Sequence, residues 1–298
     1  MVEHLHSHVL HRGSTVTITD VRCRPTESAC GPEEQAENHS VIFPRAGVFV
    51  RHVGSRSVVA NSNHVLFFNG NECYRVSHPV PGGDDCSSFT FDRTVLLEAL
   101  SRYDPDAADR PMPFGITHGP LEPKCALFQQ QLRKRLRAGA AEQIATEELA
   151  LDLLDSVLDR AYRIRGLKEI RSSCGRADLR RERAEATKTF LGGRFRARLS
   201  LAMIGRAVHV SPYHLARLFR NEVGIPIHQY VNRLRLGAAL EQIAGGAKDL
   251  TTLALDLGYS SHSHFSDAFR RTFGAPPSSF RRSTTSAQLR EMSKNLKV

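Results

Sequence analysis

The 298-residue chain lacks the features that would place it in a membrane or outside the cell. It contains no run of 18 apolar residues, so we expect no membrane-spanning helix. The stretch Met1–Arg12 holds four histidines but no apolar segment, and therefore does not read as a signal peptide. Six cysteines at irregular spacing fit reduced thiols in a cytoplasmic protein better than a disulfide framework. The hydrophobic fraction of 41% suits a soluble globular protein.

Patterns typical of an enzyme or of a metal cofactor are also missing. The sequence shows no C-x-x-C pair and no Ser-His-Asp or paired-carboxylate arrangement. Its His-x-His sets at residues 4–8 fall in a segment that we expect to be disordered and outside the strands. We therefore predict no catalytic residue, no cofactor and no metal ligand. One alternative stays open, a structural metal or a redox sensor in the β-rich region. Its candidate residues are Cys23, Cys30, Cys73 and Cys86, with His39 or His78.

Charge is distributed unevenly along the chain. Residues 1–162 carry 16 basic and 21 acidic side chains, residues 163–183 carry 8 and 3, and residues 184–298 carry 17 and 7. The three segments contribute −5, +5 and +10, which sum to the net charge of +10. This asymmetry predicts an acidic-to-neutral sensing or enzymatic part joined to a part that binds a polyanion. Charge alone does not distinguish DNA from RNA or from membrane phosphates.

The first half of the chain reads as strands followed by helices. Short β-branched and aromatic runs, about ten residues apart, predict a small β-sandwich or barrel. The expected strands are Thr15–Val21, Ser40–Phe43, Val48–Val53, His64–Phe68, Tyr74–Ser77 and Ser88–Phe91. Apolar residues at three-to-four spacing then predict two amphipathic helices, Leu121–Arg137 and Gln143–Arg165. These helices could form a dimer surface or pack on their own β-domain, and both interpretations stay open.

The second half contains an internal repeat. Ser211–Gly224 reads SPYHLARLFRNEVG, and fifty residues later Ser261–Gly274 reads SHSHFSDAFRRTFG. Both copies begin with Ser, carry His at the fourth position and Phe-Arg at the ninth and tenth, and end with Gly. Each follows a short apolar helix, Leu201–Val208 or Leu250–Leu257, so we expect two helix-turn-helix motifs. We expect a linker over residues 166–183 before them and a tail over residues 284–298 after them.

The repeated helices suit DNA recognition. A Ser at the N-cap begins each helix, and apolar residues such as Leu215 and Phe265 would face the core. The opposite faces then present side chains that can bond base edges or phosphates in a major groove. A connecting helix over Pro226–Ile243 would hold the two readers about one DNA turn apart, roughly 34 Å. The candidate DNA-binding residues are Tyr213, His214, Arg217, Arg220, Asn221, His262, Ser263, His264, Arg270 and Arg271.

The segment Gly258–Arg281, GYSSHSHFSDAFRRTFGAPPSSFR, resembles the DNA-binding domain of the AraC/XylS family of bacterial transcription regulators. The first copy fits the same pattern, and the resemblance covers residues 184–283. It implies sequence-specific binding of double-stranded DNA, with most base reading by the second helix of the first motif. It also implies phosphate contacts or weaker base readout by the second motif, which can face RNA polymerase. One departure is Gly205, where the family usually has Ala; because a helical Gly costs up to about 1 kcal/mol, we expect a looser first motif.

The β-rich half resembles the cupin-like sensing and dimerisation domain of many family members. The segments His39–Gly54 and HPVPGGDDC, which ends at Cys86, resemble a recurring subgroup of such regulators. The resemblance implies a homodimer in which residues 1–165 respond to a small-molecule effector, where one exists. The expected class is α+β, with an N-terminal cupin-like β-roll and helix pair and a C-terminal all-α domain of two helix-turn-helix motifs. The alternative function is a cupin-type enzyme, or a metal- or redox-sensing module, tethered to DNA.

Overall fold

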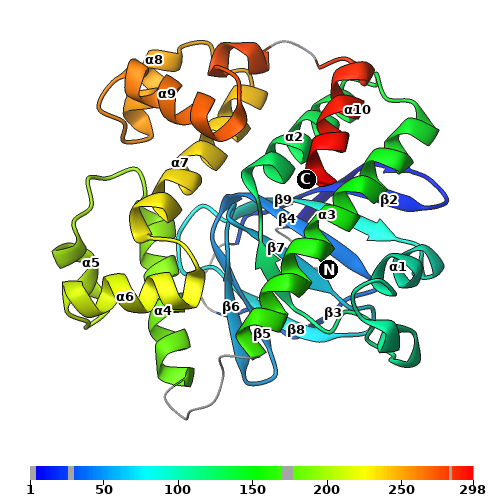
Figure 1. Ribbon diagram of the computed structural model, residues 1–298, viewed down its shortest axis with the longest axis horizontal. Helices are drawn as coiled ribbons and strands as arrows, with labels where there is room; N and C mark the ends of the chain where they lie inside the picture. Colours follow the sequence, from blue (N-terminus) through cyan, green and yellow to red (C-terminus); the bar gives the residue numbers. More distant parts are fainter. Residues whose placement is uncertain (1–4, 26–29, 170–176, 282–283, 298) are drawn as a thin grey trace.

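The chain forms a β-rich half and a helical half that lie against each other (Figure 1). The computed structural model describes residues 5–25, 30–169, 177–281 and 284–297. Antiparallel strands fill the first part and helices the second, so the predicted α+β class is confirmed. Among the described residues, no helix is both long and apolar enough to cross a membrane.

The strands of the β-rich half form two antiparallel sheets. The larger sheet has the order β1-β2-β9-β4-β7-β10, and the smaller has the order β3-β8-β5-β6. All six expected strands are present, whereas β1, β3, β6 and β10 were not expected. The bounds are β1 Leu5–Arg12, β2 Val16–Cys23, β3 Glu34–Gln35, β4 Ser40–Gly47, β5 Phe49–Val53, β6 Arg56–Ala60, β7 His64–Phe68, β8 Cys73–Ser77, β9 Asp84–Phe91 and β10 His118–Pro120.

The helices of the described chain divide between the two halves. Helices α1 to α3 follow the strands, α4 to α9 form the helical half, and α10 ends the chain. The bounds are α1 Arg93–Leu100, α2 Pro123–Arg137, α3 Gln143–Glu169, α4 Ala177–Arg194, α5 Leu201–Ala207, α6 Pro212–Val223, α7 Ile227–Ala244, α8 Leu250–Asp256, α9 His262–Phe273 and α10 Ser286–Lys294. Short 3₁₀ turns occur at Pro105–Asp109, Pro277–Arg281 and Asn295–Lys297.

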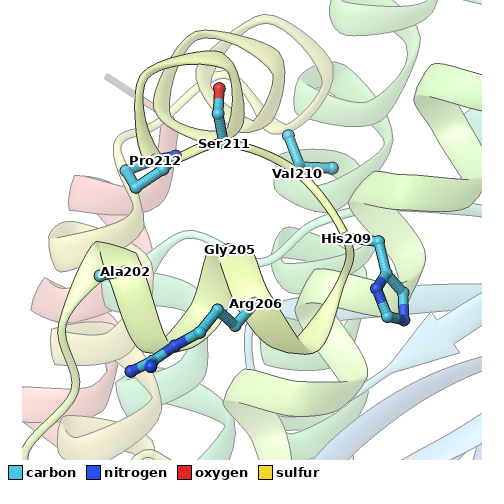
Figure 2. A pocket seen from close by; sticks show the side chains of 7 residues that line it. All are labelled: Ala202, Gly205, Arg206, His209, Val210, Ser211 and Pro212. Carbon is cyan, nitrogen blue, oxygen red and sulfur yellow. The ribbon is translucent and has the colours of Figure 1, made fainter.

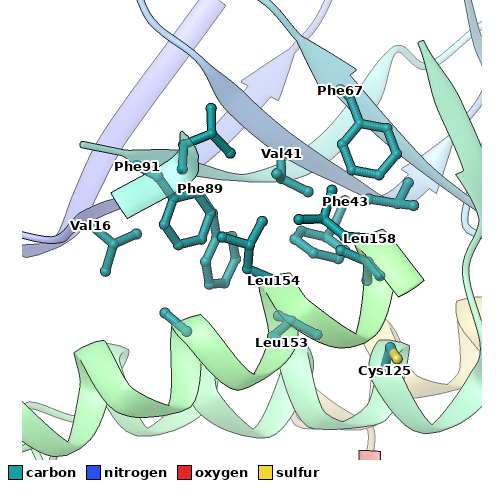
Figure 3. Close-up of a cluster of buried hydrophobic side chains, with 14 of the residues drawn as sticks. Val16, Val41, Phe43, Phe67, Phe89, Phe91, Cys125, Leu153, Leu154 and Leu158 are labelled. Atoms are coloured by element: carbon teal, nitrogen blue, oxygen red, sulfur yellow. The ribbon is translucent and has the colours of Figure 1, made fainter. Parts of the chain in front are cut away.

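One face of the larger sheet packs against α2 and α3 (Figure 3). Alternate residues of a strand point to the same face, which is why the apolar positions of β2 and β9 meet the apolar stripe of α3. The helix pair thus packs on its own β-domain, which is one of the two interpretations that the sequence left open. Dimerisation stays a prediction. Residues of this core include Val16, Ile18, Val41, Phe43, Phe89, Phe91, Leu153, Leu154 and Leu158.

The start of the chain differs from the expectation of disorder. Residues Leu5–Arg12 form β1, which pairs antiparallel with β2 so that His6 lies opposite Arg22 and His8 opposite Asp20. Most of β1 is exposed on both faces, so it does not show the alternation of apolar and polar residues that identifies a half-buried strand. Backbone pairing with β2 stabilises the strand, and side-chain patterning could not reveal it.

Helices occupy part of the expected linker and most of the expected tail. Within residues 166–183, α3 continues to Glu169 and α4 begins at Ala177, while residues 170–176 lie outside the described chain. The expected boundary at residue 183 therefore falls inside α4. In the tail, α10 packs against α2 and α3, and Leu289 and Leu296 join the core of the β-rich half.

Buried charges connect the two halves. Asp20 of β2, Arg45 of β4 and Arg133 of α2 are each only 4% exposed. The Asp20 carboxylate accepts hydrogen bonds from both guanidinium groups and also pairs with Arg137, at 3.0 Å. On its other side, Arg45 Nη1 lies 2.7 Å from the Oε1 atom of Glu241 in α7. One paired network thus extends from the sheet through α2 to the central helix of the helical half.

We predict that Asp20→Asn lowers the free energy of unfolding by about 3–5 kcal/mol at pH 7, because it leaves buried guanidinium groups without their countercharge. Burial alone would raise the pKa of Asp20, but Arg45, Arg133 and Arg137 together hold that pKa below its usual 3.8. A depressed folded-state pKa stabilises the fold above about pH 4, and this stabilisation is lost as the pH falls further. Wild-type protein should therefore lose stability more steeply in acid than the variant.

Urea denaturation between pH 7 and pH 3 measures both effects. The matched control is Asp109→Asn, an exposed carboxyl for which we expect a change within about 0.5 kcal/mol. Equal acid dependence of the wild type and Asp20→Asn would show that Asp20 does not stabilise the network.

Candidate nucleic-acid interface

Two helix-turn-helix units are present where the repeat predicts them. In the first, α5 leads into α6, and the Oγ atom of Ser211 accepts a hydrogen bond from the backbone of His214 at 3.4 Å. In the second, α8 leads into α9, and Ser261 caps the helix through the backbone of His264 at 3.1 Å. Both helices end at a left-handed glycine, Gly224 or Gly274, where a side chain would strain the backbone. The same capping residues therefore fix both ends of each candidate recognition helix.

Each recognition helix buries one face in its own core. In α6 the buried side chains are Leu215, Leu218 and Phe219, as expected from their spacing. In α9 they are Phe265, Ala268 and Phe269, with Phe273 partly buried beside them. Because these residues recur every three or four positions, the other face of each helix must be turned to solvent.

The solvent-facing sides carry the candidate DNA contacts. All ten candidates are exposed, five on α6 and five on α9. They are Tyr213, His214, Arg217, Arg220, Asn221, His262, Ser263, His264, Arg270 and Arg271. Each helix thus offers hydrogen-bond donors on its outer face, which is the arrangement that major-groove readout requires.

The two outer faces differ in how their side chains are held. On α6, Arg217 Nη1 donates to the hydroxyl of Tyr213 at 3.1 Å, and its guanidinium lies 5.6 Å from the centroid of that ring. On α9, the Nδ1 atom of His264 shares a 3.0 Å hydrogen bond with the hydroxyl of Ser260. The paired Tyr213 and Arg217 side chains restrict each other, which lowers the entropy lost when either one binds a partner.

The turn of the first motif explains the glycine at position 205 (Figure 2). A Cβ atom placed on Gly205 would lie 2.4 Å from the carbonyl oxygen of Val210, which is too close for any side chain. The backbone N–H of Val210 also donates to the carbonyl of Gly205 at 2.9 Å. Gly205 therefore permits a close approach between α5 and the turn, and the structure gives a packing reason for this departure from the family pattern.

The second turn shows why alanine is accommodated there. Ala254 occupies the place of Gly205, but seven positions separate it from Ser261, whereas six separate Gly205 from Ser211. The extra residue lengthens the second turn before its helix begins. Four positions after each small residue the backbone is left-handed, at His209 (φ 53°) and at Gly258 (φ 83°). The shorter first turn thus combines a required glycine with a histidine in a conformation that favours glycine.

Two further side chains border the first motif but were not singled out from the sequence. Arg206 and His209 line the hollow between α5 and the start of α6 (Figure 2). Both are exposed, and the N-terminus of α6 lies beside them. Because neither belongs to the repeated helix, the repeat could not reveal them; their position just before Ser211 is the available signal.

A wider cleft of about 1060 Å³ runs beside α7, between the two motifs. His264 and Arg271 of α9 line it, together with Glu122 and Lys124 of the β-rich half. Among the described residues that line this cleft, none is one of the five α6 candidates. Two of the five α9 candidates therefore share this cleft with residues of the β-rich half, whereas the five α6 candidates lie outside it.

The cysteine and histidine candidates separate into two sets. Cys23, His78 and Cys86 gather at one end of β2 and β9, and Asp84 joins them. Burial alone would lower the pKa of His78, but hydrogen bonds and charge from Asp84 and Cys23 raise it to about 9. The remaining candidates lie outside this described group; they are Cys30 and Cys73, both exposed, and His39, which bonds Gly70 and Arg93.

We predict that Gly205→Ala destabilises the protein by about 1–3 kcal/mol, because the added methyl collides with backbone that must then move. Helix propensity alone gives the opposite sign, a gain of up to about 1 kcal/mol. Thermal and urea unfolding therefore distinguish the two explanations. In Gly70→Ala, the matched control, the added Cβ makes ordinary contacts at 3.5 Å, so we expect little change. A more stable Gly205→Ala variant would mean that the glycine only loosens the motif.

Comparison with known proteins places the repeat in a family. The family described as "Helix-turn-helix domain" matches residues 204–283. The transcriptional activator AarP of Providencia stuartii is 30% identical over 96 residues, which cover 32% of this chain and 71% of AarP. The probable transcriptional regulator LumQ of Photobacterium leiognathi is 37% identical over 83 residues, 28% of this chain and 34% of LumQ.

The arabinose operon regulatory protein of Escherichia coli is 27% identical over 154 residues, which cover 52% of this chain and 51% of that protein. The match spans about a third or less of the length of several other known regulators, LumQ among them. The family match lies in the segment that carries the two helix-turn-helix units, and the similarity to AarP extends over most of that relative. The chain belongs to the AraC/XylS family of transcription regulators.

Proposed function

We propose that the protein is a sequence-specific regulator of transcription that binds double-stranded DNA through α6 and α9. The observation that carries this proposal is the repeated motif with matching caps, in which both outer faces present exposed donors. Helices of this kind enter the major groove and place side chains against base edges. The positive charge of residues 184–298 supplies the attraction to phosphates that such binding needs.

The central helix sets the separation of the two readers. Helix α7 has 18 residues and is therefore about 27 Å long at 1.5 Å per residue. A rigid connector of this length supports contacts with two successive major-groove segments on one side of the duplex, about 34 Å apart. Tyr230 and Leu234 bury one side of α7 in the core of the first motif, and Leu240 buries another in that of the second.

The first motif is the better candidate for base reading. Among the described residues that line the cleft, none is an α6 candidate, so these side chains do not share it with the β-rich half. In addition, Arg217 is already held by Tyr213. The second motif, with Arg270 and Arg271, suits phosphate contacts and a possible contact with RNA polymerase. These roles follow the division of labour that the family resemblance implies.

The β-rich half completes the proposal. We assign it effector sensing and dimerisation, with homodimers placing two copies of each motif on a promoter. An effector can change promoter binding only if it binds one arrangement of the two halves more tightly than another. A regulator of this kind acts on the chromosome, so we place it in the cytoplasm. No residue is assigned to catalysis.

We predict that Arg217→Ala lowers the affinity for a selected DNA site by about 1–3 kcal/mol, and that this loss depends on one base pair. An arginine that reads a guanine loses its contribution once that base pair is changed, so the wild type and the variant should then bind alike. Sites are selected from random duplexes with the full chain, and affinities are measured at one salt concentration. The control, Arg56→Ala, removes the same charge from an exposed position on β6.

Each outcome has a distinct meaning. A loss that is equal for every base-pair change would make Arg217 a phosphate contact and would contradict its base-reading role. Equal affinity of the Arg217→Ala and Arg56→Ala variants would remove Arg217 from the interface. Failure to select any preferred sequence would contradict the proposed function itself.

A further inference from the structure

A group of metal-ligating side chains lies in the β-rich half, apart from the DNA candidates. Cys23 at the end of β2 and Asp84 at the start of β9 are directly opposite each other on neighbouring antiparallel strands, so their side chains share a face. His78 follows β8, and its Nε2 atom is 2.7 Å from the Oδ2 atom of Asp84. One donor atom from each of these three residues lies within 4.8 Å of the other two.

Two of the three ligand residues are buried, and the third, Cys23, is partly exposed. His78 and Asp84 are each 6% exposed, and Cys86 is 4% exposed. A Cβ on Gly83 would lie 1.9 Å from the carbonyl oxygen of Cys23, and one on Gly47 would lie 2.0 Å from the carbonyl oxygen of Gly83. Only glycines allow the loop that carries His78 to lie this close to β2 and β4. The three donors are therefore positioned by packed backbone rather than by flexible surface side chains.

The chemistry of the donors selects a class of ion. A thiolate, an imidazole and a carboxylate are the ligands of Zn²⁺ and related transition metals, whereas Mg²⁺ and Ca²⁺ take oxygen ligands. The Sγ atom of Cys86 donates to the other carboxylate oxygen of Asp84 at 3.1 Å. A hydrogen bond of this type orients a ligating carboxylate and is characteristic of outer-shell residues around metals.

We propose that Cys23, His78 and Asp84 bind a divalent transition-metal ion of the zinc class, and that Cys86 orients Asp84 for this role. A buried ion pair would require only His78 and Asp84. A metal site requires in addition a third ligand, which Cys23 supplies, and a carboxylate held in one orientation, which Cys86 provides. Three protein ligands leave a fourth coordination position, which a water molecule or a small ligand can occupy. The sequence offered Cys23 and His78 only among six open candidates and missed Asp84, because the ligands come from β2, a loop and β9, with no C-x-x-C spacing.

The site is also placed to influence the helical half, an extension that rests on the proposed DNA-binding function. Val80 lies in the loop between His78 and Asp84 and touches α4 at Gly193, where an added Cβ would be 3.1 Å from the Val80 side chain. Two positions before Gly193, Leu191 is buried in the core of the first helix-turn-helix motif. A metal that fixes His78 would thereby hold this loop against α4, the helix that supports the first motif. On this proposal the metal ion is the effector of the regulator.

Metal binding is tested on the full-length, reduced protein without an affinity tag. After treatment with a chelator, the protein is titrated with Zn²⁺ and with Co²⁺, and bound metal is measured by mass spectrometry. We expect one equivalent of metal per chain and a thiolate-to-cobalt charge-transfer band in the ultraviolet. Bound Zn²⁺ should also raise the melting temperature, because a ligand that binds only the folded state stabilises it.

Substitutions locate the ion. We expect His78→Ala and Cys23→Ala to weaken Zn²⁺ binding by more than about 100-fold, since loss of an outer-shell partner alone costs about 10–100-fold. Cys86→Ala, which removes the thiol donor without adding volume at this buried position, should fall within that lower range. Asp84→Asn retains the size of the side chain, and circular dichroism shows whether each variant is folded. Cys73→Ala and the double variant His6→Ala/His8→Ala are controls that remove exposed donors elsewhere.

The outcomes separate the site from the function. Absence of stoichiometric metal, or equal metal in His78→Ala and wild type, would each overturn the proposed site. DNA affinity is then compared with and without Zn²⁺. Unchanged affinity in a metal-bound protein that still selects a DNA sequence would overturn only the regulatory role. Loss of sequence selection under both conditions would instead contradict the proposed function.

Discussion

A paired network of buried charges sets the relative placement of the two halves. Moving a charged group out of water costs several kcal/mol, so Asp20, Arg45 and Arg133 can remain buried only while they stay paired. Glu241 belongs to α7, and its contacts with Arg45 and Arg133 make the helical half part of that pairing. Separating the halves would leave Arg45 with fewer countercharges. The network therefore specifies one arrangement more strongly than apolar packing alone would, because apolar surfaces can slide.

Local signals predicted the helical half well. Capping serines, terminal glycines and three-to-four spacing act over a few residues, so Ser211–Gly224 and Ser261–Gly274 revealed the bounds of α6 and α9. The outward direction of the ten candidate side chains followed from the same periodicity. The role of Gly205 did not, because intrinsic helix propensity describes a residue without its neighbours. The carbonyl of Val210 reverses that preference, and only the folded turn brings it there.

Long-range pairing is what the sequence could not show. Arg45 and Glu241 are 196 positions apart, and Arg133 and Asp20 are 113 apart, with no periodic pattern connecting them. Strand β1 escaped prediction because its polar residues are held by backbone bonds to β2, and α10 because too few apolar residues mark it. The group of Cys23, His78 and Asp84 combines both difficulties: its members come from separate elements, and only the strand register sets Cys23 opposite Asp84.

The network and the cysteine–histidine group are connected through Arg45. Its Nη2 atom donates to the carbonyl of Cys86 at 3.2 Å, while its Nη1 atom bonds Glu241. Arg45 thus joins β9 to α7, and Val80, in the loop that precedes β9, lies against α4 at Gly193. These two routes reach both helix-turn-helix motifs from one end of the sheet. Allosteric coupling between sites is typically about 1–3 kcal/mol, and losing one buried charge–charge contact is a change of that size or larger. The contacts that extend from β9 to α7 and from its preceding loop to α4 are therefore of the strength that coupling between the two halves would need.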